Sequence, residues 1–287
     1  MSTPYVKKAD SNELVAIAWN TNGTMCRCVR LGRRDCMEPH ERHWIRLPLD
    51  GACNVRELGG YPTADGGCTR FHRFLRSDGL GRLTQRDQDF LRSYGVRAIL
   101  DLRDESEVAD FPDVSLGPEV LYANIPLFGF NAAEIEELER NFTPETFSIE
   151  MVYQRMLENY EGIRACMRFL ADAPDGCVLF HCAVGKDRTG VIAMLLLCLA
   201  GVDRWDVVSN YIQSRTNLMR DEAFAADWED RTRSPFRDGM RSEPETIEFA
   251  YDLVDVDHGG IDTYLLECGV SDEEIALVRT RLTGDLV

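Results

Sequence analysis

Long apolar runs are missing from this 287-residue chain. No segment approaches the roughly 20 consecutive apolar residues that a membrane-spanning helix needs, so stable membrane insertion is not expected. The opening stretch, MSTPYVKKADSNEL, also lacks the apolar core of a secretory signal peptide, which predicts a cytoplasmic protein. In the reducing cytosol the ten cysteines are expected to be free thiols and not a disulfide framework.

Positive charge is also scarce, because 32 Lys and Arg face 49 Asp and Glu and give a formal net charge of −17. This excess of acidic groups argues against nucleic acid as a partner. Basic residues nevertheless outnumber acidic ones in residues 24–103, whereas residues 104–287 are strongly acidic. The Arg-rich part is a candidate surrounding for an anion site, although an ordinary solvated surface gives the same pattern.

Short apolar strands that alternate with helical patterns predict an α/β layer structure with a central sheet flanked by helices. Near the N-terminus, two β-prone runs surround Asn22-Gly23, which is typical of a tight hairpin turn, and HWIRLPL (43–49) is a third candidate strand. Thr84 and Gly95 bracket an expected helix. Further expected elements are strands at 96–104, 120–128 and 177–182, and helices within 131–172 and from 189 onward.

The segment VLFHCAVGKDRTGVIAML (178–195) carries the strongest functional signal. A Cys followed six positions later by an Arg means little alone, because this chain contains that spacing four times. Only at Cys182 and Arg188 does a short apolar run lead into the cysteine and a long helical run follow the arginine. A glycine, Gly185, lies between the two, and only there does a hydroxyl residue, Thr189, directly follow the arginine.

A tight loop between a strand end and a helix N-terminus turns backbone N–H groups inward, and the helix dipole adds partial positive charge. Such a nest binds a phosphate dianion and stabilises a thiolate, which lowers a cysteine pKa from about 8.5 to roughly 3.5–7.5. The fork of Arg188 can hold two phosphate oxygens, and Thr189 can donate its hydroxyl to the thiolate. The expected chemistry is attack of Cys182 on phosphorus and hydrolysis of the resulting phosphocysteine. The alternative is a buried, inert thiol.

The stretch HCAVGKDRTG resembles the signature of the cysteine-dependent protein tyrosine phosphatase superfamily. Its GKDRTG ending is similar to the bacterial branch of tyrosine and lipid phosphatases found in Mycobacterium and Listeria. Further pieces similar to that branch follow in the same order, NVRELGGY (54–61), RFLRSDGL (73–80), ILDLRDESE (99–107) and YLLECGVSDEEIALVRTRL (264–282). The resemblance implies a dual-specificity-phosphatase-like α/β domain at 45–287, and we expect residues 1–44 to be an N-terminal β-hairpin extension packed on it.

The resemblance also implies the activity, which is hydrolysis of phosphomonoesters through a phosphocysteine. Phosphotyrosine is the first expected substrate, with phosphoserine, phosphothreonine and phosphoinositides as further ones, so a phosphorylated protein or a phosphoinositide is the expected partner. No cofactor and no metal is expected. Two alternatives stay open, a phospho-ligand-binding pseudoenzyme of the same fold and a rhodanese-like or arsenate-handling thiol enzyme. The expected substrate contacts all lie in one loop, at Ala183, Val184, Gly185, Lys186, Asp187, Arg188 and Thr189.

The general acid has two candidates, because residues 131–172 contain no Trp-Pro-Asp-like loop. In the resembling branch the acid is the Asp inside the loop, which is Asp187 here; the alternative is that Asp187 only fixes the loop by hydrogen bonds. Asp101 is the second candidate, although at a strand end it can equally position Arg103 or the loop.

Two neighbours of the nucleophile have expected supporting roles. Lys186 adds positive charge beyond the need of one phosphotyrosine, and tensin-type phosphoinositide phosphatases share a Lys in that neighbourhood; a solvated lysine is the alternative. His181 is expected to hydrogen-bond to backbone and to shape the loop.

Three further features are weaker. Cys26, Cys28, Cys36, His40 and His43 lie close in sequence, but their spacing is not a common zinc pattern, so zinc is not expected. Cys53 is a candidate resolving thiol for Cys182 under oxidation. Residues 131–160 look like a helical cover, which the resemblance interprets as a lid over the loop; a solvated helical face is the alternative.

Overall fold

The computed structural model describes residues 15–19, 25–30, 46–128, 148–222, 224–226 and 242–284. The chain divides into two units, Met1–His43 and Trp44–Val287. In the first unit, β1 (Val15–Trp19) pairs antiparallel with β2 (Met25–Arg30), as the run around Asn22-Gly23 predicts. That this unit packs on the second one stays a prediction.

The candidate zinc residues lie outside what the structure describes. Cys36, His40 and His43 fall in the segment between residues 30 and 46, and only the backbone of β2 is described at Cys26 and Cys28. The expectation that this cluster holds no zinc therefore stays a prediction.

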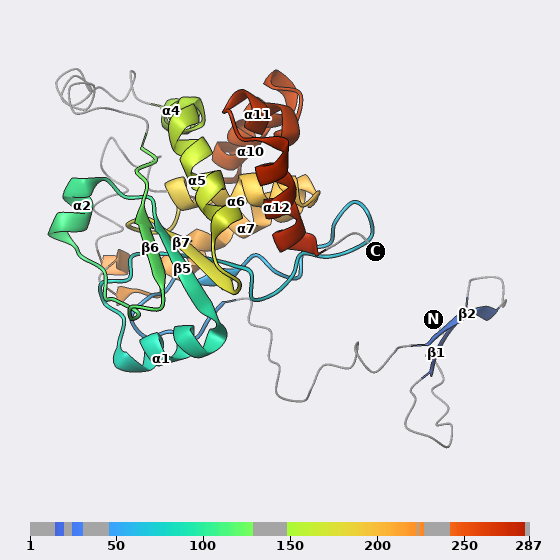
Figure 1. The fold of residues 1–287 in the computed structure, drawn as a ribbon, viewed down its shortest axis with the longest axis horizontal. Coiled ribbons are helices and arrows are strands. Elements are labelled where there is room, and N and C mark those ends of the chain that lie inside the picture. The colour runs from blue at the N-terminus through green and yellow to red at the C-terminus, as the bar shows by residue number, and fades with distance from the viewer. Residues whose placement is uncertain are drawn as a thin grey trace. The chain divides into compact units, whose positions relative to one another are not determined.

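The second unit is built on a five-stranded sheet with the order β3-β4-β7-β5-β6 (Figure 1). Its strands are β3 (Arg56–Glu57), β4 (Phe74–Ser77), β5 (Val96–Asp101), β6 (Leu121–Asn124) and β7 (Cys177–His181). The last four run parallel, and β3 pairs antiparallel with β4 at the edge. The sheet flanked by helices and the predicted strands at 96–104, 120–128 and 177–182 are confirmed.

The strand predicted at 43–49 is wrong within its described part. Arg46 makes only an isolated bridge to Arg56, and Leu47 donates one backbone hydrogen bond to Val55. Pro48 has no backbone N–H and cannot continue the ladder, which is why the pairing stops there.

Helix α1 (Gln85–Tyr94) covers one face of the sheet (Figure 1). The helices that pack over the other face are α4, α5, α6, α7, α10, α11 and α12. The ends of α1 are set by the predicted Thr84, which forms a capping box with Asp87, and by Gly95 in the left-handed conformation at φ 101°. The other helices are α2 (Glu105–Asp110), α4 (Ile149–Glu158), α5 (Tyr160–Asp172), α6 (Asp187–Leu199), α7 (Arg204–Leu218), α10 (Pro244–Asp252), a π-helical turn (Leu253–Asp257), α11 (Ile261–Glu267) and α12 (Asp272–Thr283).

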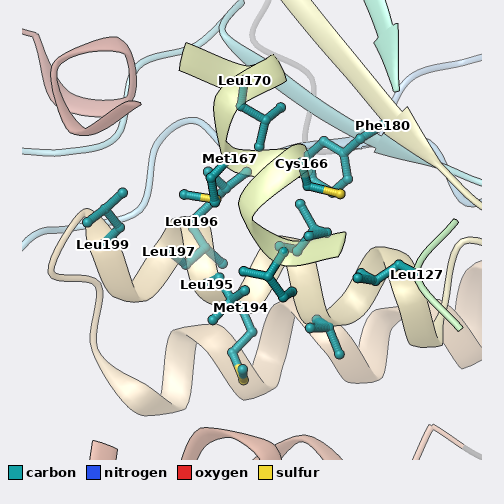
Figure 2. Packing of buried hydrophobic residues seen from close by; sticks show 14 of the residues in the cluster. Leu127, Cys166, Met167, Leu170, Phe180, Met194, Leu195, Leu196, Leu197 and Leu199 are labelled. Atoms are coloured by element: carbon teal, nitrogen blue, oxygen red, sulfur yellow. The ribbon is translucent and has the colours of Figure 1, made fainter. Parts of the chain in front are cut away.

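Successive side chains of β7 point to opposite faces of the sheet, so they belong to two separate layers of the core. Val178 and Phe180 belong to the layer under α5 and α6, and Cys177 and Leu179 belong to the layer that α1 covers. Helix α6 is buried nearly all round, and Figure 2 shows its leucines against the apolar face of α5. This burial fixes the N-terminus of α6 at the carboxyl end of β7. No helix in the described ranges is long and apolar enough to cross a membrane.

Candidate active site

The predicted nucleophile lies at the carboxyl end of the parallel strands, where ligands commonly bind in α/β sheets. Strand β7 ends at His181, α6 begins at Asp187, and residues 182–186 form the loop between them, here called the Cys182 loop. Cys182 is 2% exposed. His181 is in register with Ser77 of β4 and with Asp101 of β5, so the carboxyl ends of three parallel strands meet at this loop.

Neighbouring segments hold the carbonyl groups of the Cys182 loop. Gly79 donates its backbone N–H to the Ala183 carbonyl at 3.0 Å. The Asn54 side-chain amide donates to the carbonyls of Val184 and Gly185, both at 3.0 Å. Because successive carbonyls are bound on the outside of the loop, its N–H groups turn toward the inside, as an anion-binding nest requires.

Arg76, the next-to-last residue of β4, completes this outer support. Its Nη2 donates to the carbonyl of Gly185 at 2.9 Å and to that of Lys186 at 3.3 Å. Gly185 has a φ of +68°, and a Cβ there would lie 2.3 Å from the Ser77 carbonyl oxygen. Only glycine fits this position, because it tolerates both the positive φ and the close backbone approach.

Asp78 connects the end of β4 to Asn54. Its carboxylate accepts from the backbone N–H of Asn54 at 2.9 Å and of Cys53 at 3.0 Å. The Cys53 thiol donates to the same carboxylate at 3.4 Å, and burial together with the Asp78 charge raises the pKa of Cys53 to about 12. The Cys53 thiol therefore stays protonated near neutral pH, which makes it a poor nucleophile. Its role as a resolving thiol stays a prediction.

Arg188, in the first turn of α6, is bound by Glu107 of α2. Its Nη2 donates to Oε1 at 2.8 Å, and Nη1 donates to Oε2. Burial alone would lower the pKa of Arg188, but Glu107 and the charge of Cys182 raise it above its usual value. A guanidinium has five N–H donors, so donors beyond the two that Glu107 occupies remain for phosphate oxygens.

Asp187 begins α6, and its Oδ1 has two partners. The Tyr153 hydroxyl of α4 donates to it at 2.8 Å, and Lys186 Nζ lies 3.2 Å away. Tyr153 in turn pairs with the Tyr211 hydroxyl of α7 at 2.8 Å. The Lys186 side chain is 3% exposed, so the solvated-lysine alternative is wrong. Helix α4 thus contacts the first residue of α6, directly after the Cys182 loop. Residues 131–147 of the expected lid lie outside the described residues.

His181 and Asp101 belong to a buried ionic network behind the loop. The His181 Nδ1 lies 3.2 Å from the Cys182 carbonyl, and its Nε2 lies 3.0 Å from Oδ2 of Asp113. Arg103 Nη2 contacts the carboxylates of Asp101 at 2.6 Å and of Asp113 at 2.8 Å. Burial alone would raise the pKa of Asp101, but the hydrogen bonds from Arg103 hold it below its usual value. An ionised Asp101 suits the positioning of Arg103 better than acid catalysis.

Asp101, Asp113 and His181 are also close enough to share a metal ion. The Arg103 guanidinium already lies against both carboxylates and supplies the positive charge there. This donor set therefore suits an ionic network better than a metal. Thr189 is fully buried, and among the described residues its hydroxyl has no hydrogen-bond partner.

Sequence reasoning from the residues alone did not identify five groups that the structure places around the loop. They are Asn54, Arg76, Glu107, Asp113 and Tyr153. Three of them lie in NVRELGGY, RFLRSDGL and ILDLRDESE, so those quoted segments were the available signal. Nothing in the local pattern marks Asp113 or Tyr153, which act only through residues distant in sequence.

Comparison with known proteins gives consistent matches over the second unit. The model of the tyrosine phosphatase family matches residues 47–284. A tyrosine-protein phosphatase of Nostoc commune is 34% identical over 218 residues, which cover 73% of this chain and 74% of the relative. The triple specificity protein phosphatase PtpB of Mycobacterium tuberculosis is 24% identical over 275 residues, covering 82% of this chain and 98% of the relative.

One solved structure found by the comparison is P. aeruginosa TpbA. It covers 69% of this chain and 86% of its own, with 14% identity and a TM-score of 0.33. A similarity of that size carries no functional argument.

Proposed function

The chain belongs to the tyrosine phosphatase family and is a phosphatase, and we propose that it hydrolyses phosphotyrosine in proteins with Cys182 as nucleophile. One observation carries the assignment. The carbonyls of Ala183, Val184 and Gly185 are all held from outside the loop. The inward N–H groups, the helix N-terminus and Arg188 then form a site for a phosphate dianion directly at the thiol.

The proposed reaction has two displacements at phosphorus. In the first, Cys182 Sγ attacks, the P–S bond forms, and the bond from phosphorus to the leaving oxygen breaks while that oxygen takes a proton. In the second, a water molecule attacks the phosphocysteine, loses a proton to the same acid-base group, and the P–S bond breaks. Arg188 and the loop amides stabilise the charge on the transferred phosphoryl oxygens throughout.

We assign the proton to Asp187. Among the described residues, both polar contacts of Asp187 are to Oδ1, so Oδ2 is the oxygen that we expect to carry the proton toward the leaving group. Asp104 is the alternative carboxyl, because it lies 3.9 Å from Nη1 of Arg188. Burial raises the pKa of Asp104, which favours a proton donor. Replacing each carboxyl by Asn distinguishes the two candidates. Loss of the true acid should lower turnover of a substrate with a poor leaving group more than turnover of p-nitrophenyl phosphate.

We extend the substrate proposal to phosphoserine, phosphothreonine and phosphoinositides at lower rates. The relative from Mycobacterium tuberculosis is named a triple specificity protein phosphatase. In this chain Lys186 is buried beside Asp187, so part of its charge is offset within the site. A single phosphate is therefore better matched than a polyphosphorylated headgroup.

The test is phosphate release from a phosphotyrosine peptide, a phosphoserine peptide and a phosphoinositide, each measured with wild type and Cys182→Ser. The buffer contains EDTA and a reducing agent. We expect fastest release from the phosphotyrosine peptide, no effect of EDTA, and loss of turnover in Cys182→Ser with binding of phosphate retained. Turnover that survives Cys182→Ser, or that EDTA abolishes, would overturn the thiolate mechanism.

The thiol mechanism also bears on location. A cysteine nucleophile works only while it is reduced, so we propose that the protein acts in a reducing compartment such as the cytosol.

A further inference from the structure

Two arginines lie buried behind the Cys182 loop. Arg56 and Arg76 are each 1% exposed. Among the described residues, neither guanidinium has a carboxylate partner within salt-bridge distance, and all of their hydrogen bonds go to neutral acceptors. Buried charges in proteins are normally paired, because leaving water without a counter-charge is costly. The Asp78 carboxylate acts on Arg56 without contacting it. Arg76 is therefore the member of the pair that needs an anion from elsewhere.

The contacts of Arg76 point to the loop. Besides the carbonyls of Gly185 and Lys186, it donates to the Asn210 side-chain oxygen at 2.7 Å. Asn210 is itself 1% exposed, and its amide donates to the Tyr61 hydroxyl at 3.0 Å. Asn210 thus fixes the guanidinium by a hydrogen bond without neutralising it.

Arg56 binds Asn54, the second side chain that supports the Cys182 loop. Its Nη1 donates to the backbone and side-chain oxygens of Asn54 at 2.8 Å and 2.6 Å, and its Nη2 reaches the Ser214 hydroxyl at 2.8 Å. Asn54 is the residue whose side-chain amide donates to the carbonyls of Val184 and Gly185. The two arginines therefore support the same stretch of backbone from adjacent positions.

The charge of Arg76 is coupled to the nucleophile. Burial lowers the pKa of Arg76 to about 10, and the negative charge of Cys182 acts in the opposite direction. At neutral pH the guanidinium is therefore still positive. Because attraction between opposite charges acts on both, a positive Arg76 also attracts negative charge at the Cys182 loop.

We propose that Arg76, backed by Arg56, is a positioning residue whose unneutralised charge stabilises the Cys182 thiolate and the phosphate bound at the loop. The counter-anion that Arg76 lacks is then supplied by the nucleophile and the substrate. This inference rests on the proposed function of the loop, but it concerns residues outside the loop itself.

The sharpest test is Asn210→Asp, which places a carboxylate at the atom that already accepts from Arg76. The readout is the pH midpoint for iodoacetamide alkylation of the Cys182 peptide, followed by mass spectrometry. We expect the midpoint to rise by about one pH unit, a tenfold loss of thiolate at a given pH. Inhibition by inorganic phosphate should weaken about tenfold, while the melting temperature stays the same or rises because the buried charge gains a partner.

Asn210→Ala is the control for lost side-chain contacts, since it removes the hydrogen bonds with Arg76 and Tyr61 and adds no charge. Its midpoint should stay near that of wild type. A folded Asn210→Asp protein with the wild-type midpoint and the wild-type phosphate inhibition would overturn the proposal.

A second pair of variants decides the matter if Asn210→Asp does not fold. Arg76→Met should raise the alkylation midpoint, Arg76→Lys should keep it near wild type because the charge remains, and the exposed Arg86→Met should change nothing. Equal midpoints in the Met and Lys variants would overturn the charge argument. Alkylation and phosphate binding need no turnover, so failure of this proposal is distinguishable from failure of the phosphatase mechanism.

Discussion

Glu107 holds both terminal nitrogens of Arg188, with 2.8 Å between Oε1 and Nη2. Glu107 is also the capping-box residue of α2 and accepts from the backbone N–H of Asp104 at 2.9 Å. Burial alone would raise the pKa of Glu107, but the Arg188 hydrogen bond holds it below its usual value, so the pair is ionic. The orientation of the phosphate-binding arginine is therefore set by a short helix far away in the sequence.

The first prediction concerns this pair. Glu107→Gln keeps the shape but removes the charge, so Arg188 loses its fixed orientation and kcat should fall about tenfold, as misplaced catalytic groups do. Inhibition by inorganic phosphate should not weaken, because the guanidinium loses a competing anion. Steady-state kinetics with phosphate as inhibitor measure both quantities. The exposed Glu105→Gln, in the same first turn, is the control, and an equal loss of kcat there would contradict the prediction.

A second prediction follows from the backbone of the loop. Gly185→Ala should nearly abolish activity and lower the free energy of unfolding by more than the roughly 1–2 kcal/mol expected for a left-handed residue with a side chain. The added Cβ would lie 2.3 Å from the Ser77 oxygen, so the loop must move. Gly66→Ala is the matched control, because Gly66 has a φ of +87° with open space around its Cβ position. Urea unfolding and turnover are measured for both variants. Gly66→Ala reports the cost of backbone strain alone, and the further loss in Gly185→Ala reports the clash.

The hydroxyl pair behind Asp187 gives a third prediction. Tyr153→Phe removes the hydrogen bond to Asp187, which alters the environment of the proposed acid. We expect kcat to drop several-fold to tenfold for phenyl phosphate, a substrate with a poor leaving group, and little for p-nitrophenyl phosphate. Tyr211→Phe leaves the bond to Asp187 in place and should change neither rate much. Equal effects of the two variants on phenyl phosphate would argue against Asp187 as the acid.

The buried pair of Asp101 and Arg103 predicts how stability depends on pH. The folded pKa of Asp101 is lowered, so its contribution is present above the unfolded pKa of about 3.9 and is lost as the pH falls through the folded value. Asp101→Asn should cost about 3 kcal/mol or more at pH 7, because Arg103 is left without this partner. The difference in the free energy of unfolding between Asp101→Asn and wild type should narrow below about pH 4. Urea unfolding at pH 7 and pH 3 tests this, with the exposed Asp110→Asn as control.

Local patterns predicted the elements whose determinants are close in sequence. Thr84 and Gly95 mark the ends of α1 because a cap bonds to residues within one turn. The β7 run and the helical run after Arg188 were predicted in the same way, and they place Cys182 between them. The prediction at 43–49 is wrong in its described part for a local reason as well, because Pro48 interrupts the ladder despite its apolar neighbours.

The sequence by itself determined the nucleophile, the arginine six residues later and the loop that joins them, because a strand, a turn and a helix start are encoded by adjacent residues. Tertiary structure alone decided what holds that loop in place. Ser77 lies beside His181 only because β4 and β7 are parallel neighbours, and this pairing brings Arg76 to the Gly185 carbonyl. Such contacts join residues more than 100 positions apart, and no local periodicity encodes which strand ends will meet.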